Sequence, residues 1–141
     1  MRHVVFRLER DRYALPLSAI REVVQVPARY TRVPRAPPAL RGVMNLRGRV
    51  VPVIDLRQLL ELGPGPAATA CLRIVLLELG RRDLGLLVTD VDGIESIEKV
   101  VPSSARSSPS VRGLARVGAL AITVLDPEGL DALVARTFTR S

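Results

Sequence analysis

The chain has 141 residues, a net charge of +7 and 48% hydrophobic residues, which is typical of one folded domain and excludes disorder as the main state. No apolar stretch approaches the roughly 20 residues that a membrane-spanning helix needs, and the N-terminal segment lacks a long apolar region, so we expect a cytoplasmic protein. The single cysteine, Cys71, cannot form an internal disulfide, and the single histidine, His3, offers no zinc cluster.

The positive charge is unevenly distributed along the chain. Residues 1–62 hold twelve arginines and five acidic residues, whereas residues 63–141 hold nine basic and nine acidic residues. A basic excess of this size indicates a nucleic acid, an anionic membrane or an acidic partner. With four aromatic residues and no Trp, the chain has little material for base stacking, which weakens the nucleic-acid interpretation.

The first half is predicted to begin with a hairpin. Residues 4–8 and 13–17 alternate apolar and polar side chains on either side of a charged tip at residues 9–12. Ser18 is a possible cap of a brief helical turn that leads into a strand at 20–26. Four prolines between residues 27 and 40 then predict a surface connector without a long regular element.

Two further strands are predicted between Gly42 and Asp55, joined by a tight turn at Arg47-Gly48 in which the glycine supplies backbone freedom. Residues 56–62 favour one or two helical turns. A Gly- and Pro-rich linker at 63–71 follows, then a second hairpin from residues 72–79 and 84–91, and a polar loop at 103–110.

An internal repeat relates the two halves at an offset of 71 residues. It aligns Phe6 with Leu77, Leu15 with Leu86 and, further along, Asp55 with Asp126. Each copy is too small to be comfortably stable alone, so we expect repeats 1–62 and 72–134 to pack together as one domain over 1–141. The pattern predicts a mostly β fold with short helical turns, and small closed barrels are favoured because closure removes exposed edges.

The sequence offers no constellation for catalysis. His3 is isolated, and Cys71 fits an idle thiol better than a reactive one. The run 90–93 (Asp-Val-Asp-Gly) begins like a calcium loop but lacks the later ligands, so we interpret its acids as turn residues. Residues 63–66 lack the Lys and Ser/Thr of a phosphate loop. We therefore expect no enzyme, no metal and no cofactor, and a binding module remains.

Two segments have the character of a contact surface. Arg47 places a charged guanidinium on a rigid turn, where it can form forked hydrogen bonds to a carboxylate or to backbone carbonyls. Glu22 lies among the β-branched residues Ile20 and Val23, which predicts an apolar patch with a charge at its rim. On local pattern alone, a solvated hairpin tip and a plain edge strand are equally good interpretations.

Longer motifs resemble the CheW family of chemotaxis coupling proteins. They are Tyr13-Ala14-Leu15-Pro16-Leu17, Ile20-x-Glu22-Val23 and the specific run from Gly42 to Arg57, GVMNLRGRVVPVIDLR, and the similarity continues through residues 74–94 and 111–114. The resemblance implies two pseudo-symmetric, five-stranded SH3-like β-barrels packed together. It also implies a non-catalytic adaptor that bridges the cytoplasmic tips of chemoreceptors and the regulatory domain of the histidine kinase CheA, in arrays beneath the inner membrane.

The resemblance also implies contact residues. They are Ile20, Glu22, Val23, Gly42, Asn45, Leu46, Arg47 and Gly48, with Arg47 the strongest candidate. The second hairpin, residues 116–120, departs from the family pattern, and the basic first half is unusual for it. Two alternatives stay open: an adaptor of the same fold in a non-chemotactic kinase pathway, such as motility or development, and a basic nucleic-acid-binding β-barrel.

Overall fold

A computed structural model describes residues 1–62, 73–79, 82–102 and 109–139. The expected linker 63–71 and most of the polar loop lie outside the described residues. Ten strands and three helical segments follow one another along the chain: β1 (Arg2–Leu8), β2 (Asp11–Pro16), η1 (Leu17–Ala19), β3 (Ile20–Gln25), β4 (Leu40–Leu46), β5 (Arg49–Asp55), α1 (Leu56–Leu59), β6 (Arg73–Leu79), β7 (Arg82–Val88), β8 (Asp90–Ser96), β9 (Val111–Val117), β10 (Leu120–Leu125) and α2 (Pro127–Thr139).

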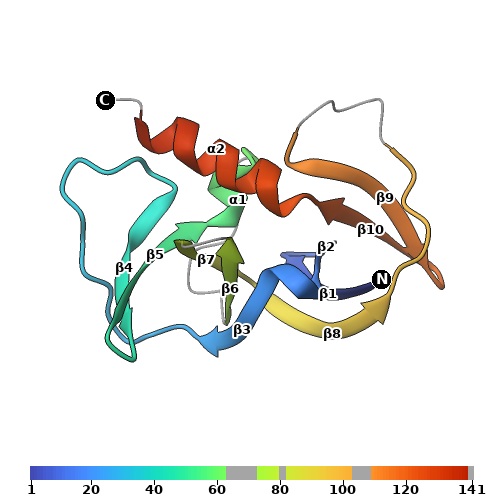
Figure 1. Cartoon of the computed structure of the whole chain (residues 1–141), viewed down its shortest axis with the longest axis horizontal. Coiled ribbons are helices and arrows are strands. Elements are labelled where there is room, and N and C mark those ends of the chain that lie inside the picture. Colours follow the sequence, from blue (N-terminus) through green and yellow to red (C-terminus); the bar gives the residue numbers. More distant parts are fainter. Residues whose placement is uncertain (63–72, 80–81, 103–108, 140–141) are drawn as a thin grey trace.

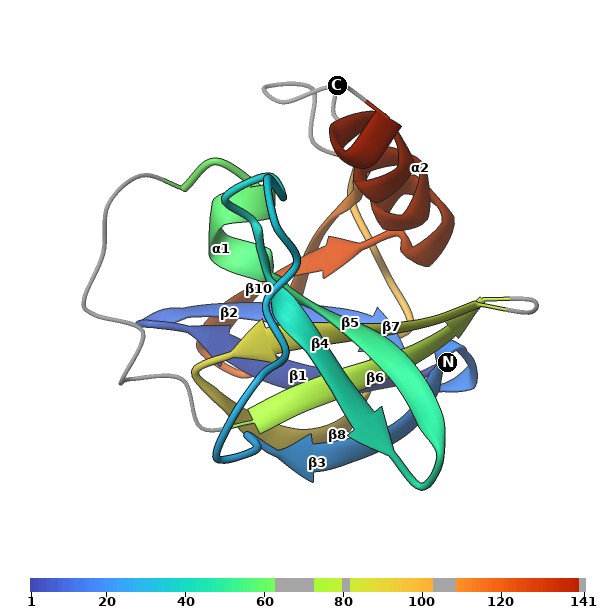
Figure 2. The ribbon, with the colours of Figure 1, turned by 90° about the vertical axis from the view of Figure 1, so that its left-hand side faces the viewer.

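The strands form two five-stranded sheets, and each sheet mixes the two halves of the chain. One sheet has the order β8-β1-β2-β10-β9 and the other the order β3-β6-β7-β5-β4. The first hairpin therefore lies with the later strands, while the second hairpin lies with the earlier ones (Figures 1 and 2). We call the β8-β1-β2-β10-β9 unit barrel A and the other unit barrel B.

The offset of 71 found in the sequence relates the strands of the two barrels. β1 and β6 begin 71 residues apart, and so do β2 and β7, β4 and β9, and β5 and β10. The tight turns match as well, because Leu46 pairs with Arg49 in one barrel and Val117 with Leu120 in the other. The internal repeat is therefore a structural repeat whose hairpins are exchanged between barrels.

Three apolar clusters explain why these strands are almost continuously hydrophobic. Val5 and Ala14 belong to the interior of barrel A, and Met44 and Ile74 to that of barrel B. Alternate residues of the same strands, such as Phe6 and Val75, enter a third cluster shared by the two barrels. Because side chains alternate across a strand, both faces of the central strands are buried, one inside a barrel and one between the barrels.

Helix α2, with 13 residues, is longer than the helical turns expected. A carboxylate oxygen of Asp126 accepts a hydrogen bond from the Glu128 amide at 3.3 Å, and Pro127 occupies the first turn, where its missing N–H costs nothing. Leu130 and Val134 are buried in the shared cluster. Ser18 also differs from expectation, since it lies within η1 and provides no side-chain cap. Within the described residues, no helix has the length and apolar character needed to cross a membrane.

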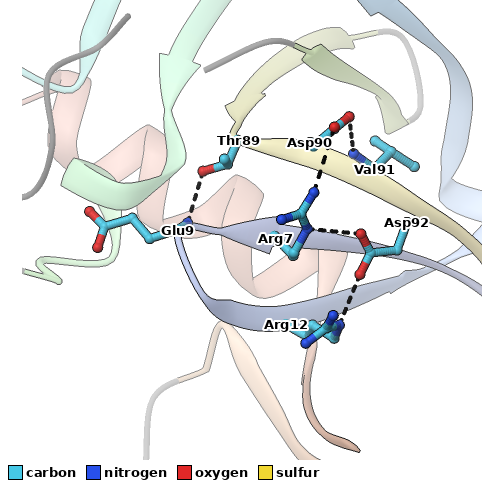
Figure 3. Close-up of polar contacts among 7 residues, drawn as sticks. All are labelled: Arg7, Glu9, Arg12, Thr89, Asp90, Val91 and Asp92. Carbon is cyan, nitrogen blue, oxygen red and sulfur yellow. Dashed lines mark hydrogen bonds and ion pairs between the residues drawn. The ribbon is translucent and has the colours of Figure 1, made fainter. Parts of the chain in front are cut away.

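Asp90 and Asp92, expected in a turn, lie instead on strand β8, where they pair with arginines of the first hairpin (Figure 3). Asp92 accepts hydrogen bonds from Arg7 and Arg12, both at 2.9 Å, and Arg7 also lies 3.6 Å from Asp90. Arg7 and Arg12 are direct cross-strand partners, an arrangement in which like charges repel. Asp92 relieves that repulsion, and we call Arg7, Arg12 and Asp92 the basic clamp.

Barrel B carries the same arrangement with the charges reversed. Glu78 and Asp83 are direct cross-strand partners, and Arg21 lies 3.8 Å from the first and 3.4 Å from the second. We call these three residues the acidic clamp. Every member lies 71 residues from its counterpart in the basic clamp, so a position that is acidic in one barrel is basic in the other.

The reversed charges favour the exchanged pairing. If each hairpin paired with the third strand of its own half, Arg21 would meet Arg7 and Arg12, and Asp92 would meet Glu78 and Asp83. Like charges directly opposite one another destabilise a sheet. The connections act in the same direction, since η1 and the single residue Thr89 join the second and third strands of each half.

His3 is buried, with 2% of its surface exposed, at the position that corresponds to Ile74 in barrel B. Burial lowers its pKa below the usual 6.5, against a raising contribution from its hydrogen bond to the Met1 carbonyl. The unfolded chain therefore takes up a proton at a higher pH than the folded chain, so acid favours unfolding. We expect the free energy of unfolding to fall as the pH drops through about 6.5 and to level off below the pKa of the folded state. Denaturant unfolding at several pH values tests this, and a His3→Leu variant that keeps the same fall would contradict it.

Candidate functional site

The β4–β5 turn projects Arg47 from the end of barrel B. Arg47 and Gly48 both have positive φ, 51° and 85°, as a two-residue type I′ hairpin requires. A non-glycine residue in the left-handed region carries a conformational cost, which the Asn45 side chain offsets by accepting a hydrogen bond from the Gly48 amide at 2.8 Å. The side chain of Arg47 remains 66% exposed.

Glu22 of strand β3 forms an ion pair with Arg47. Strand β3 is at one edge of its sheet and β4 at the other, so this pair spans the two edge strands of barrel B. The contact holds the guanidinium in place while leaving much of it accessible. An ordered, exposed Arg can donate several directed hydrogen bonds to a partner with little further loss of side-chain entropy.

Exposed apolar side chains accompany this ion pair. Val23, next to Glu22, is 37% exposed, and Val50, the cross-strand partner of Asn45, is 69% exposed. Val50 was not among the residues expected from the sequence. The alternation in β5 is the signal that finds it, because Val51 and Val53 point into barrel B and Val50 must face outward. We call Glu22, Val23, Asn45, Arg47 and Val50 the coupling surface.

Acidic residues from the second hairpin hold the base of this surface. Asp83 pairs with Arg49 and also with Arg21, and its side chain is only 11% exposed. Asp83 comes from the other half of the chain, so its contribution depends on the exchange of hairpins and was not expected from the sequence. The exchange therefore brings three charged segments together at one end of barrel B.

The structure does not bring all eight sequence-predicted residues to the surface. Leu46 is half-buried against the interior of barrel B, and Ile20 is half-buried against the shared cluster. Gly42 is buried, and a Cβ there would lie 2.7 Å from the carbonyl oxygen of Thr31. Its lack of a side chain lets the connector pack onto β4, so Gly42 acts through packing.

The equivalent end of barrel A is chemically different. Gly93 and Gly118 occupy the positions that correspond to Glu22 and Arg47, so the ion pair has no counterpart there. Ile94, Leu114 and Leu120 are instead 48%, 46% and 42% exposed. The pseudo-symmetric molecule therefore has one charged end and one apolar end.

Comparison with known proteins places this architecture. The chain matches the model of the CheW-like domain over residues 2–133. It is 35% identical over 122 residues to the probable chemotaxis protein CheW of Rhizobium etli, covering 84% of this chain and 76% of that protein. It is also 29% identical over 115 residues to protein PilI of Pseudomonas aeruginosa, covering 77% of this chain and 64% of that protein.

Among solved structures, the scaffolding protein TtCheW from Thermoanaerobacter tengcongensis matches with a TM-score of 0.77 and 29% identity, over 92% of this chain and 90% of that one. The expectation of two SH3-like barrels in a mostly β fold is thus confirmed. Because the family match covers nearly the whole chain and both barrels, this protein belongs to the CheW family, and it is a non-catalytic coupling adaptor of chemotaxis signalling.

Proposed function

We propose that the chain acts in the cytoplasm, as one domain over residues 1–141, by coupling the tips of chemoreceptors to the regulatory domain of the histidine kinase CheA. The observation that carries this proposal is the Glu22–Arg47 ion pair at an exposed edge of barrel B. It lies between the exposed apolar residues Val23 and Val50. Apolar contact supplies affinity, and the charged pair fixes the orientation of the partner.

The asymmetry between the two ends supports a bridging role. An adaptor that joins two different proteins needs two chemically distinct surfaces, and the charged end of barrel B differs from the apolar end of barrel A. Each contact is small, so affinity in an array comes from simultaneous engagement of several sites and the resulting high effective concentration.

The test is the binding of purified Arg47→Glu protein to the CheA regulatory domain from the same genome at physiological salt. We expect affinity to fall at least about tenfold, which corresponds to about 1.4 kcal/mol, because the introduced carboxylate would repel Glu22 and reverse the charge offered to the partner. Arg116→Glu is the matched control, since Arg116 is exposed near the turn of barrel A and the charge change is the same. Equal binding by the Arg47 variant and the wild type would refute the role of Arg47.

A double variant, E22R with R47E, separates folding from recognition. The intramolecular ion pair is restored with its direction reversed, so stability should return to near the wild-type value. Binding to the kinase domain should remain weak because the exposed charge at the turn is still negative. Recovered binding in the double variant would mean that the ion pair matters only for folding.

The similarity to PilI favours a second candidate, an adaptor of the same fold in a kinase pathway other than chemotaxis. It predicts that the chain binds a different histidine kinase through the same coupling surface. Binding measured side by side against each CheA-like regulatory domain of the genome distinguishes the two candidates.

A further inference from the structure

We propose that the connector between β3 and β4, residues 27–38, is a docking site for an acidic segment of a partner protein. This goes beyond the coupling surface, because the residues that carry it do not belong to that surface. The connector lies at the end of the molecule formed by β4 and β5, opposite the β9–β10 turn (Figure 1).

The charge of this part of the chain is one-sided. Residues 23–54 contain six arginines and no acidic residue. Three of these arginines are neutralised by acids outside the segment: Arg41 lies 3.7 Å from Asp55, and Arg47 and Arg49 pair with Glu22 and Asp83. The other three are Arg29, Arg32 and Arg35, and the ion pairs between described residues include none of them.

These three arginines account for much of the charge that the fold leaves uncompensated. All three are exposed, and they recur at every third residue of the connector. Of the twelve arginines in residues 1–62, seven form ion pairs with described acids. Three of the remaining five are gathered within this one segment.

The connector is held in place before any partner arrives. The amide of Thr31 donates to the Val43 carbonyl at 2.8 Å, and the amide of Val43 donates to the Thr31 carbonyl at 2.9 Å. Tyr30 packs partly against the interior of barrel B. Pro27, Pro34, Pro37 and Pro38 restrict the backbone on both sides. A preordered site loses little conformational entropy on binding.

The chemistry of the connector selects a carboxylate-rich protein segment. Guanidinium groups form paired hydrogen bonds with carboxylates, and Val33, 41% exposed between two of the arginines, offers an apolar contact. A single-stranded nucleic acid would use aromatic platforms, and Tyr30, the aromatic residue of this segment, is engaged with the barrel interior.

The test is an NMR titration of the ¹⁵N-labelled full chain with a short peptide of alternating Asp and Glu residues. We expect amide shift changes centred on residues 29–35, weakened as salt is raised from about 0.05 M to about 0.3 M. The triple variant R29Q/R32Q/R35Q should bind the peptide about tenfold more weakly, as expected for the loss of three exposed charge contacts. An otherwise identical Asn/Gln peptide should cause no shifts.

The matched control is R2Q/R10Q/R116Q, which removes the same charge at three exposed arginines elsewhere and should bind the peptide like the wild type. Equal weakening of both triple variants would show attraction to net charge alone and overturn the proposal. Tighter binding of a thymidine oligonucleotide of matched charge at the same residues would also overturn it, in favour of a nucleic-acid ligand. Because this test uses no kinase or receptor, its failure is separate from failure of the coupling role.

Discussion

Exchanging the central charges of the two clamps, Arg21→Asp together with Asp92→Arg, is expected to lower the free energy of unfolding by about 2 to 3 kcal/mol. The change replaces four favourable contacts with four like-charge contacts and leaves the net charge unaltered. Each half-exposed ion pair contributes at most a few tenths to about 1 kcal/mol after screening by solvent, so the effect comes from their number. Urea unfolding of the two proteins at low salt measures it.

A triple variant shows whether complementarity is the cause. Arg7→Glu, Arg12→Glu and Asp92→Arg together restore opposite charges within the clamp of barrel A, and most of the stability that Asp92→Arg alone removes should return. Raising the salt concentration should narrow the gap between the Asp92→Arg protein and the wild type. If the triple variant were less stable than Asp92→Arg alone, the clamps would not contribute through charge.

Gly113→Ala is expected to cost about 3 kcal/mol or more and to reduce the yield of folded protein. Gly113 has a φ of 157°, and a Cβ there would lie 2.3 Å from the carbonyl oxygen of Val101. That oxygen accepts the Leu114 amide at 2.8 Å, so relieving the clash would break the bridge between the two segments. The expected cost combines overpacking with a conformation that residues with side chains rarely adopt.

Gly93→Ala is the control that separates these two causes. Gly93 has a φ of 143° but no atom within 4 Å of the position its Cβ would take, so this substitution adds backbone strain without a clash. We expect a cost of about 1 kcal/mol. Thermal and denaturant unfolding of both variants would reveal the difference. Similar losses in the two proteins would show that steric contact at Gly113 is unimportant.

Local structure could be predicted well from the sequence, because it depends on neighbouring residues. The alternation in residues 4–17 and the Arg47-Gly48 pair identified hairpins at their observed positions. The offset of 71 matched strand to strand. Residues 127–139 were missed as a long helix, although Leu130, Leu133, Val134 and Phe138 follow helical spacing.

The exchange of hairpins could not be predicted, because a period of two residues shows which faces are buried without showing which strand lies alongside. The ion pairs of Asp83 and Asp92 depend on that exchange. The sequence likewise suggested a turn at Asp90 and Asp92, since acids beside a glycine are common in turns. The contact between Glu22 and Arg47 joins two edge strands, so only the fold brings these residues together.

The course of strand β3 has a mechanical consequence. Its outer side carries Glu22 and Val23, while its N-terminal end continues through three residues of η1 into β2, which lies at the centre of barrel A's sheet. A load applied where a partner grips β3 is therefore passed along the backbone into the opposite barrel. The molecule should resist bending between its two ends and act as a stiff strut that fixes the spacing of the proteins bound to it.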